Sequence, residues 1–142
     1  MKNRSSILAL AVVLALAGIL AACGGARDLA PKTAREEKPA TMTAQALHAR
    51  LQSKEKPLIV DVREPSEFQE GHIEGAKLAP LGSVEQGVAD IRKDREIVLV
   101  CRSGRRSGKA QELLAARGYT NLRNMEGGML AWEKNAYPVV KP

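Results

Sequence analysis

Two short runs of almost uninterrupted apolar residues constrain the fold of this chain more than any other feature. One occupies residues 58–62, where only Asp61 is polar, and the other occupies residues 97–100. Strands covered on both faces of a parallel sheet have this composition, whereas half-exposed strands alternate apolar with polar residues. Because helical patterns separate the two runs and follow the second, the sequence predicts an α/β fold, a parallel sheet with helices on both faces.

Weaker signals predict the remaining elements. Shorter strands are expected at residues 41–43, 76–79 and 121–124. Helices are expected to start at Thr43, at Pro65, at Ser83, after residue 104 and at residues 127–128. The helix capped by Ser83 is predicted to extend through Val88 to Ile91.

The composition fits one globular domain. The chain has 142 residues, of which 44% are hydrophobic and 27% charged. Its formal net charge is +6; leaving Lys2 and Arg4 out of the 22 basic residues gives 20 against 16 acidic ones, or +4. A charge this small, without interleaved aromatic residues, is not typical of nucleic-acid binding. We therefore expect no nucleic-acid partner and favour a small anionic substrate.

The N-terminus has the pattern of an export signal. Lys2 and Arg4 precede an apolar run at residues 7–22 that contains Gly18. This run is shorter than the roughly 20 residues that a membrane-spanning helix needs. Residues 1–22 are therefore predicted to be a signal peptide that is removed.

Residues 20–23, Leu-Ala-Ala-Cys, resemble the bacterial lipobox. The resemblance implies cleavage before Cys23 and attachment of lipid to its sulfur, so that acyl chains would anchor the protein to a membrane of the cell envelope. Gly24 rather than Asp follows, which in a Gram-negative host implies the periplasmic face of the outer membrane, although the inner membrane stays open. The alternative is an ordinary signal peptide that leaves a free thiol on Cys23.

Residues 23–40 contain Gly, Ala, Pro and charged side chains but no apolar periodicity. This composition is typical of a flexible tether. The sequence thus divides into a signal peptide (1–22), a lipidated cysteine with its tether (23–40) and a folded domain (41–142).

Cys101 is the strongest candidate for chemistry. It directly follows the run at residues 97–100, and open parallel sheets bind ligands beyond the carboxyl ends of their strands. The next five residues are Arg102, Ser103, Gly104, Arg105 and Arg106. Such a loop can direct backbone N–H groups and a helix N-terminus at the sulfur, and its arginines add positive charge that favours a thiolate. The alternative is an inert buried cysteine.

Four stretches resemble the rhodanese family in order and spacing. They are residues 61–68 (Asp-Val-Arg-Glu, then Glu-Phe), 71–76 (Gly-His-Ile-Glu-Gly-Ala), 101–107 (Cys-Arg-Ser-Gly-Arg-Arg-Ser) and 127–139 (Gly-Gly, Ala-Trp, Tyr-Pro-Val). The resemblance covers nearly the whole predicted domain and is closest to small, exported, single-domain rhodaneses. It implies a five-stranded parallel sheet with helices on both faces.

The resemblance also implies a double displacement through Cys101. The thiolate would take sulfane sulfur from thiosulfate or a similar donor, and the persulfide would pass it to cyanide or a thiol, with no metal or organic cofactor. Backbone N–H groups of residues 102–106 would hold the persulfide, and the arginine side chains would attract the donor. The alternative is a persulfide carrier or redox-sensing binding module with little turnover of its own.

The length of the cysteine loop distinguishes sulfur transfer from phosphatase activity. Phosphatases and arsenate reductases of similar fold place five residues between the cysteine and the arginine that holds the oxyanion. Here four residues separate Cys101 from Arg106, and a shorter ring should fit sulfur better than a phosphoryl group.

Several other residues have structural interpretations. Asp61 and Arg63 could hydrogen-bond the cysteine loop or each other, which favours support over catalysis. Trp132 is expected to anchor the core and His48 to lie on the polar side of its helix. With only two histidines and no ligand spacing, no metal site is predicted. Two positions depart from the family pattern, Glu74, where Pro is frequent, and Ala136, where Gly is frequent.

Overall fold

The computed structural model describes residues 40–142. The predicted signal peptide, Cys23 and the tether up to residue 39 lie outside that part of the chain. Among the helices of residues 40–142, none has the length and apolarity needed to cross a membrane. The elements, in chain order, are β1 (Thr41–Met42), α1 (Ala44–Leu51), β2 (Leu58–Asp61), α2 (Pro65–Glu70), β3 (Lys77–Leu78), α3 (Leu81–Gln86), β4 (Ile97–Val100), α4 (Arg105–Ala116), β5 (Leu122–Met125) and α5 (Gly128–Lys134).

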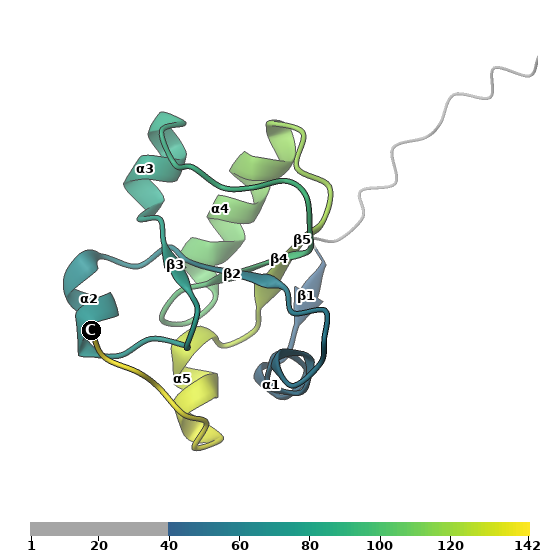
Figure 1. The fold of residues 1–142 in the computed structure, drawn as a ribbon. Coiled ribbons are helices and arrows are strands. Elements are labelled where there is room, and N and C mark those ends of the chain that lie inside the picture. Colours follow the sequence, from purple (N-terminus) through teal and green to yellow (C-terminus); the bar gives the residue numbers. More distant parts are fainter. Residues whose placement is uncertain (1–39) are drawn as a thin grey trace, which may run out of the picture. The chain divides into compact units, whose positions relative to one another are not determined.

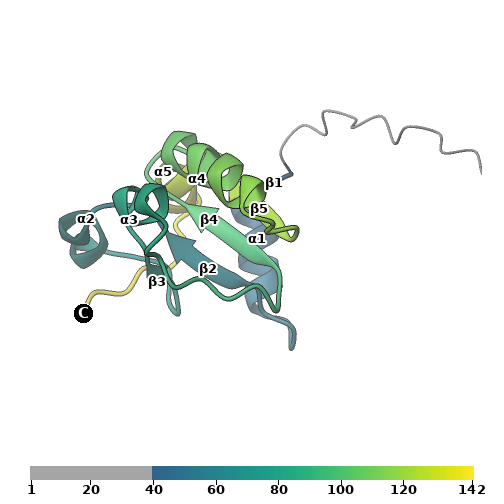
Figure 2. The ribbon, with the colours of Figure 1, turned by 90° about the horizontal axis from the view of Figure 1, so that it is seen from above.

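The five strands form one parallel sheet in the order β1-β5-β4-β2-β3 (Figures 1 and 2). The two apolar runs become neighbouring inner strands, with Leu58 of β2 opposite Ile97 of β4 and Asp61 opposite Val100. This register places the residues that follow Asp61 and Val100 at the same edge of the sheet. The predicted α/β fold with a five-stranded parallel sheet is confirmed.

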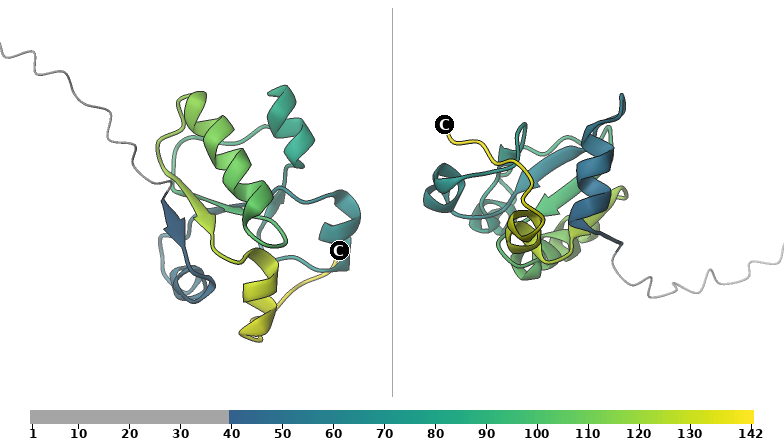
Figure 3. Two further views of the ribbon diagram at one scale, coloured as in Figure 1. Left: turned by 180° about the vertical axis from the view of Figure 1, so that it is seen from behind. Right: turned by 90° about the horizontal axis from the view of Figure 1, so that it is seen from below.

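Helices cover both faces of the sheet, which explains why β4 is apolar at every position. Helices α3 and α4 lie over one face, and α1 and α5 lie over the other (Figures 1 and 3). Ile97 and Leu99 belong to the first core cluster, with Val84 and Leu114, whereas Val98 and Val100 belong to the second. Alternate side chains of one strand therefore fill two separate cores.

Helix α1 begins as the sequence predicts, since the side chain of Thr43 accepts a hydrogen bond from the N–H of Ala46 at 3.1 Å. His48 on this helix departs from its prediction. Its ring stacks on Tyr137 at 4.0 Å between centroids and meets Trp132 edge-on, so it faces the C-terminal segment rather than only solvent. Trp132 is 1% exposed and lies in the core as predicted.

The prediction for the helix after Ser83 was wrong. Helix α3 begins at Leu81, directly after Pro80, so Ser83 lies inside it rather than capping it. The helix ends at Gln86 because Gly87 adopts a left-handed conformation (φ 76°), which glycine tolerates at a helix C-terminus. Val88, expected within the helix, is 70% exposed.

The departure from the family pattern at residue 136 has a conformational consequence. Ala136 has φ 53°, and it is the one residue other than glycine with positive φ in the range 40–142. A side chain raises the energy of this conformation by about 1 kcal/mol relative to glycine. The turn between α5 and the C-terminal segment is therefore mildly strained in this chain.

Candidate active site

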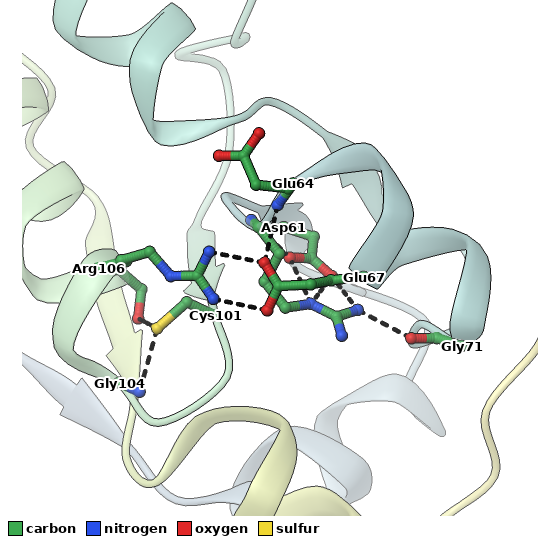
Figure 4. Close-up of polar contacts among 9 residues, drawn as sticks. Asp61, Glu64, Glu67, Gly71, Cys101, Gly104 and Arg106 are labelled. Carbon is green, nitrogen blue, oxygen red and sulfur yellow. Dashed lines mark hydrogen bonds and ion pairs between the residues drawn. The ribbon is translucent and has the colours of Figure 1, made fainter.

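The sulfur of Cys101 lies where the carboxyl end of β4 meets the N-terminus of α4 (Figure 4). The residue is 1% exposed. Gly104 caps α4 in a left-handed conformation (φ 91°), and this turn aims its N–H at the Cys101 Sγ at 3.1 Å. The hydroxyl of Ser107, on the first turn of α4, lies 3.3 Å from the same sulfur. Helix α4 thus presents its positive end to Cys101.

These donors change the acidity of the thiol. Burial of the sulfur raises the pKa of Cys101. This effect is outweighed by the Ser107 hydroxyl, in the orientation in which it donates to the sulfur, and by the backbone N–H groups of Ser107, Ser103 and Gly104. The pKa of Cys101 consequently lies below its usual range. A partly desolvated sulfur ringed by N–H groups is suited to hold a negative charge.

Helix α5 supports the opposite side of the cysteine loop. In its first turn, the N–H groups of Met129 and Leu130 donate to the carbonyl oxygens of Cys101 at 2.8 Å and Arg102 at 3.0 Å. Gly128 approaches the loop so closely that a Cβ there would lie 2.2 Å from the Cys101 oxygen. Only glycine fits at this position. From the sequence, the glycine pair at residues 127–128 predicts a helix start but not this contact to the site.

Arg106 does not point freely into solvent. Its guanidinium donates two hydrogen bonds of 2.7 Å to the carboxylate of Glu67 on α2 (Figure 4). These bonds are the main cause that lowers the pKa of Glu67 to about 2. Glu67 also accepts from the N–H of Glu64 in a capping box at the start of α2. The sequence indicates no role for Glu67, because no local pattern identifies a partner so far along the chain.

The remaining loop residues predicted for substrate binding are spread around the sulfur. Arg102, Ser103 and Arg105 are exposed, while Gly104 is half-buried. Within residues 40–142, neither Arg102 nor Arg105 takes part in an ion pair. The two exposed guanidiniums are therefore the cations of the loop available to a dissolved anion.

Asp61 and Arg63 pair with each other beneath the loop. The guanidinium donates to both carboxylate oxygens at 2.7–3.0 Å, and its Nη2 also donates to the Gly71 carbonyl oxygen at 2.8 Å. Their side chains are only 1% and 7% exposed. Of the two arrangements expected for this pair, the structure contains the one in which the residues bind each other. The pair fixes the end of β2 to the end of α2.

Two polar residues complete the surroundings of the sulfur. The Ser107 hydroxyl donates to Asn124 Oδ1 at 2.6 Å, and Asn124 Nδ2 donates to the Gly104 carbonyl oxygen at 2.9 Å. Asn124 lies on β5, next to β4 in the sheet. The sequence pattern predicts no function for either residue. Their common signal is that each lies at or near an element end on the carboxyl edge of the sheet.

A pocket of about 220 Å³ adjoins the loop between α2 and α5. Its lining residues are Arg63, Glu67, Glu70, Gly71, Arg102, Met129, Leu130, Glu133 and Val139. A larger hollow of about 450 Å³, with Pro57 and Glu96 in its lining, lies at the amino ends of β2 and β4, away from Cys101. Within residues 40–142, no group of His, Cys, Asp and Glu side chains is arranged to hold a metal ion.

Comparison with known proteins identifies the fold and the family. Residues 43–135 match the rhodanese-like domain. The chain is 37% identical over 99 residues to a sulfurtransferase of Allochromatium vinosum, covering 70% of this chain and 92% of that protein. It is 35% identical over 97 residues to the putative sulfurtransferase YtwF of Bacillus subtilis, covering 68% and 93%.

A solved structure agrees with these relatives. The crystal structure of a rhodanese-related protein from Thermoplasma volcanium superimposes with a TM-score of 0.66 at 28% identity, covering 72% of this chain and 99% of that one. The crystallised chain, nearly all of which is matched, thus shows that a domain of this extent can fold by itself. The sheet, the cysteine loop at its carboxyl edge and the match over residues 43–135 lead to one conclusion: this chain belongs to the rhodanese-like domain family, which includes sulfurtransferases.

Proposed function

We propose that the protein is a sulfurtransferase that moves sulfane sulfur from thiosulfate, or a similar anionic donor, to cyanide or a thiol through a persulfide on Cys101. The observation that carries this proposal is the hydrogen bond of 3.1 Å from the Gly104 N–H to Sγ at the N-terminus of α4. That arrangement stabilises negative charge on sulfur, both in the attacking thiolate and in the persulfide that replaces it.

The proposed reaction has two displacements. The Cys101 thiolate attacks the outer sulfur of thiosulfate, a new S–S bond forms, and the old S–S bond breaks with its electron pair leaving on sulfite. Cyanide or a thiolate then attacks the terminal sulfur of the persulfide, and the electron pair of that bond returns to Sγ. No net oxidation occurs and no external electron carrier is needed.

The charged side chains have separate tasks in this proposal. Arg102 and Arg105, exposed beside the loop, attract the dianionic donor by long-range electrostatics. Arg106 is held by Glu67, so its contribution to that field is partly neutralised. The backbone N–H groups carry the local stabilisation because they are fixed in place before the reaction.

The direct test is thiocyanate production from thiosulfate and cyanide by a fragment of residues 26–142, with its Cys101→Ser variant as control. Both core clusters and all five strands lie within this fragment. Thiocyanate from the parent and none from the variant is the expected result. If the parent is folded, with its thiol reduced, and forms no thiocyanate, the proposed enzymatic activity is rejected. A persulfide detected on Cys101 in that case would indicate a persulfide carrier instead.

We further propose that the full chain is a lipoprotein of the cell envelope, anchored through Cys23. The proposal rests on the lipobox-like residues 20–23. Expression of the full chain in bacteria fed a labelled fatty acid should label the parent and leave a Cys23→Ser variant unlabelled. Equal labelling of both would reject the anchor, and fractionation of the envelope would then separate inner from outer membrane.

A further inference from the structure

The Cys101 sulfur belongs to a closed ring of hydrogen-bonded groups. One member of this ring, Asn124, lies outside the cysteine loop and helix α4. Gly104 N–H donates to Sγ at 3.1 Å, and the Gly104 carbonyl oxygen accepts from Asn124 Nδ2 at 2.9 Å. Asn124 Oδ1 accepts from the Ser107 hydroxyl at 2.6 Å, and that hydroxyl lies 3.3 Å from Sγ. The ring therefore runs from sulfur to Ser107, to Asn124, to Gly104 and back to sulfur.

The orientation of the Asn124 amide follows from its partners. A carbonyl oxygen cannot donate, so the group that faces the Gly104 oxygen at 2.9 Å must be the amide nitrogen. The amide oxygen consequently faces Ser107. A separation of 2.6 Å between two oxygens requires a proton between them, and only the Ser107 hydroxyl can supply it.

Ser107 has a single hydroxyl proton, and two acceptors compete for it. In the thiol form, S–H donates to the Ser107 oxygen while the hydroxyl donates to Asn124, so all groups are satisfied. In the thiolate form the sulfur needs the hydroxyl proton, and Asn124 Oδ1 would then face a bare oxygen at close range. Ser107 is 0% exposed and Cys101 is 1% exposed, so bulk water cannot supply the missing hydrogen bond to either acceptor.

We propose that Asn124 is a positioning residue that controls the free thiolate through Ser107, by holding the hydroxyl proton away from the sulfur. The competition disappears once the persulfide forms, because Sγ is then a neutral bridging atom and the negative charge lies on the outer sulfur. Asn124 thus destabilises the empty thiolate relative to the loaded persulfide. It favours loading of sulfur without touching the donor.

The position of the Asn124 amide depends on a glycine of helix α4. A Cβ built on Gly108 of α4 would lie 3.3 Å from Asn124 Nδ2. Glycine at residue 108 therefore leaves the space that the amide occupies between β5 and α4. The hydrogen bonds to Ser107 and to the Gly104 carbonyl oxygen hold the amide in that space.

The first test measures the pH dependence of iodoacetamide alkylation in the 26–142 fragment, in which Cys101 is the sole cysteine. Asn124→Ala should react about three- to tenfold faster below the thiol pKa, because one hydrogen bond is transferred to the thiolate. Asn124→Asp keeps an acceptor facing Ser107 and adds a negative charge near the sulfur, so it should react more slowly. Asn121→Ala, on an exposed side chain before the same strand, is the matched control and should leave the rate unchanged.

The decisive comparison repeats these variants in a Ser107→Ala background. Asn124→Ala should then have no effect on alkylation, because no shared proton remains. An effect of equal size with and without Ser107, or shifts in the same direction for Asn124→Ala and Asn124→Asp, would overturn the proposal and leave Asn124 as loop support only. If the alanine variant does not fold, Asn124→Asp carries the test, and its slowing must be larger with Ser107 present.

The second test rests on the proposed sulfur transfer. At a pH above the thiol pKa and a fixed ratio of thiosulfate to sulfite, the ratio of persulfide-loaded to empty Cys101 should be about three- to tenfold lower in Asn124→Ala than in the parent. An unchanged ratio would reject the effect on loading. The alkylation measurement needs no sulfur donor, so its outcome stays independent of whether thiosulfate is a substrate.

Discussion

Two arginine–carboxylate pairs lie near the cysteine loop, and they differ in burial and in what they connect. Arg63 and Asp61 are two residues apart at the end of β2, with side chains 7% and 1% exposed. Arg106 and Glu67 are 39 residues apart on α4 and α2, with side chains 30% and 26% exposed. The two pairs have similar hydrogen-bond geometry, but the second pair is much more exposed to solvent.

The difference determines what each pair contributes. A buried charge that loses its partner has no water to replace it, so breaking such a pair destabilises a protein strongly. A part-exposed pair can exchange its partner for water, so it contributes little to stability. The Asp61 pair therefore maintains the edge of the sheet on which the loop rests, and the Glu67 pair adjusts the charge beside the sulfur.

The largest expected effect is on the buried pair. Asp61→Ala leaves Arg63 charged and without a carboxylate partner in the interior, and should lower the free energy of unfolding by about 3–5 kcal/mol. Urea denaturation of the 26–142 fragment measures this. A double variant, Asp61→Ala with Arg63→Met, should recover part of the loss because it removes both charges. A loss below about 1 kcal/mol for the single variant would contradict the distinction between the pairs.

A smaller effect is expected when the charge is retained. Arg63→Lys keeps the cation beside Asp61 but loses the forked contacts, including the bond to the Gly71 carbonyl oxygen. Each lost hydrogen bond contributes about 0.5–1.5 kcal/mol, so the variant should lose about 1–2 kcal/mol in the same urea experiment. A loss as large as that of Asp61→Ala would show that fork geometry, rather than charge pairing, stabilises this edge.

The comparison also shows which features the sequence could predict. The apolar runs at residues 58–62 and 97–100 predicted the inner strands, because continuous burial imposes continuous apolarity. The placement of Cys101 followed, since a residue after a parallel strand must lie at the carboxyl edge. The local pair of Asp61 and Arg63 was among the stated possibilities because its members are neighbours in the chain.

Contacts between distant segments were not predictable in the same way. The Glu67–Arg106 pair depends on how α2 and α4 are placed, and no local pattern encodes that distance. For the same reason the contact of Asn124 with the loop was not predictable, since Asn124 lies on β5, 17 residues beyond Ser107. The limits of α3 were missed for a different reason, because Ser83 is a permissive residue whose capping preference was overridden by Pro80 and Gly87 on either side.

The exposed pair should affect activity more than stability. Glu67→Gln removes a negative charge beside the donor's approach and leaves the charge of Arg106 less neutralised. Under the proposed function, kcat/KM for thiosulfate should rise about two- to fivefold at low salt and return toward the parent value at high salt. Stability should change by less than about 1 kcal/mol.

Glu85→Gln is the matched control for that variant, because Glu85 also pairs with a cation, Lys109, on the same helix as Arg106. It alters net charge equally but lies away from the loop, so kcat/KM should stay near that of the parent. An equal rise in both variants would assign the effect to net charge alone. A stability loss of several kcal/mol in Glu67→Gln would mean that the two pairs do not differ as their burial indicates.

The smallest effect concerns acid stability and comes from the pKa of Glu67, which folding lowers from 4.5 to about 2. Because the folded pKa is the lower one, the unfolded chain binds the proton first as pH falls. The pair therefore contributes its full stability above about pH 4.5 and loses it progressively down to about pH 2. For a part-exposed pair that contribution is no more than about 1 kcal/mol. Urea midpoints of the parent and Glu67→Gln should accordingly differ at pH 6 and converge toward pH 2, whereas a difference that stays constant over this range would show that the carboxylate's ionisation does not contribute to stability.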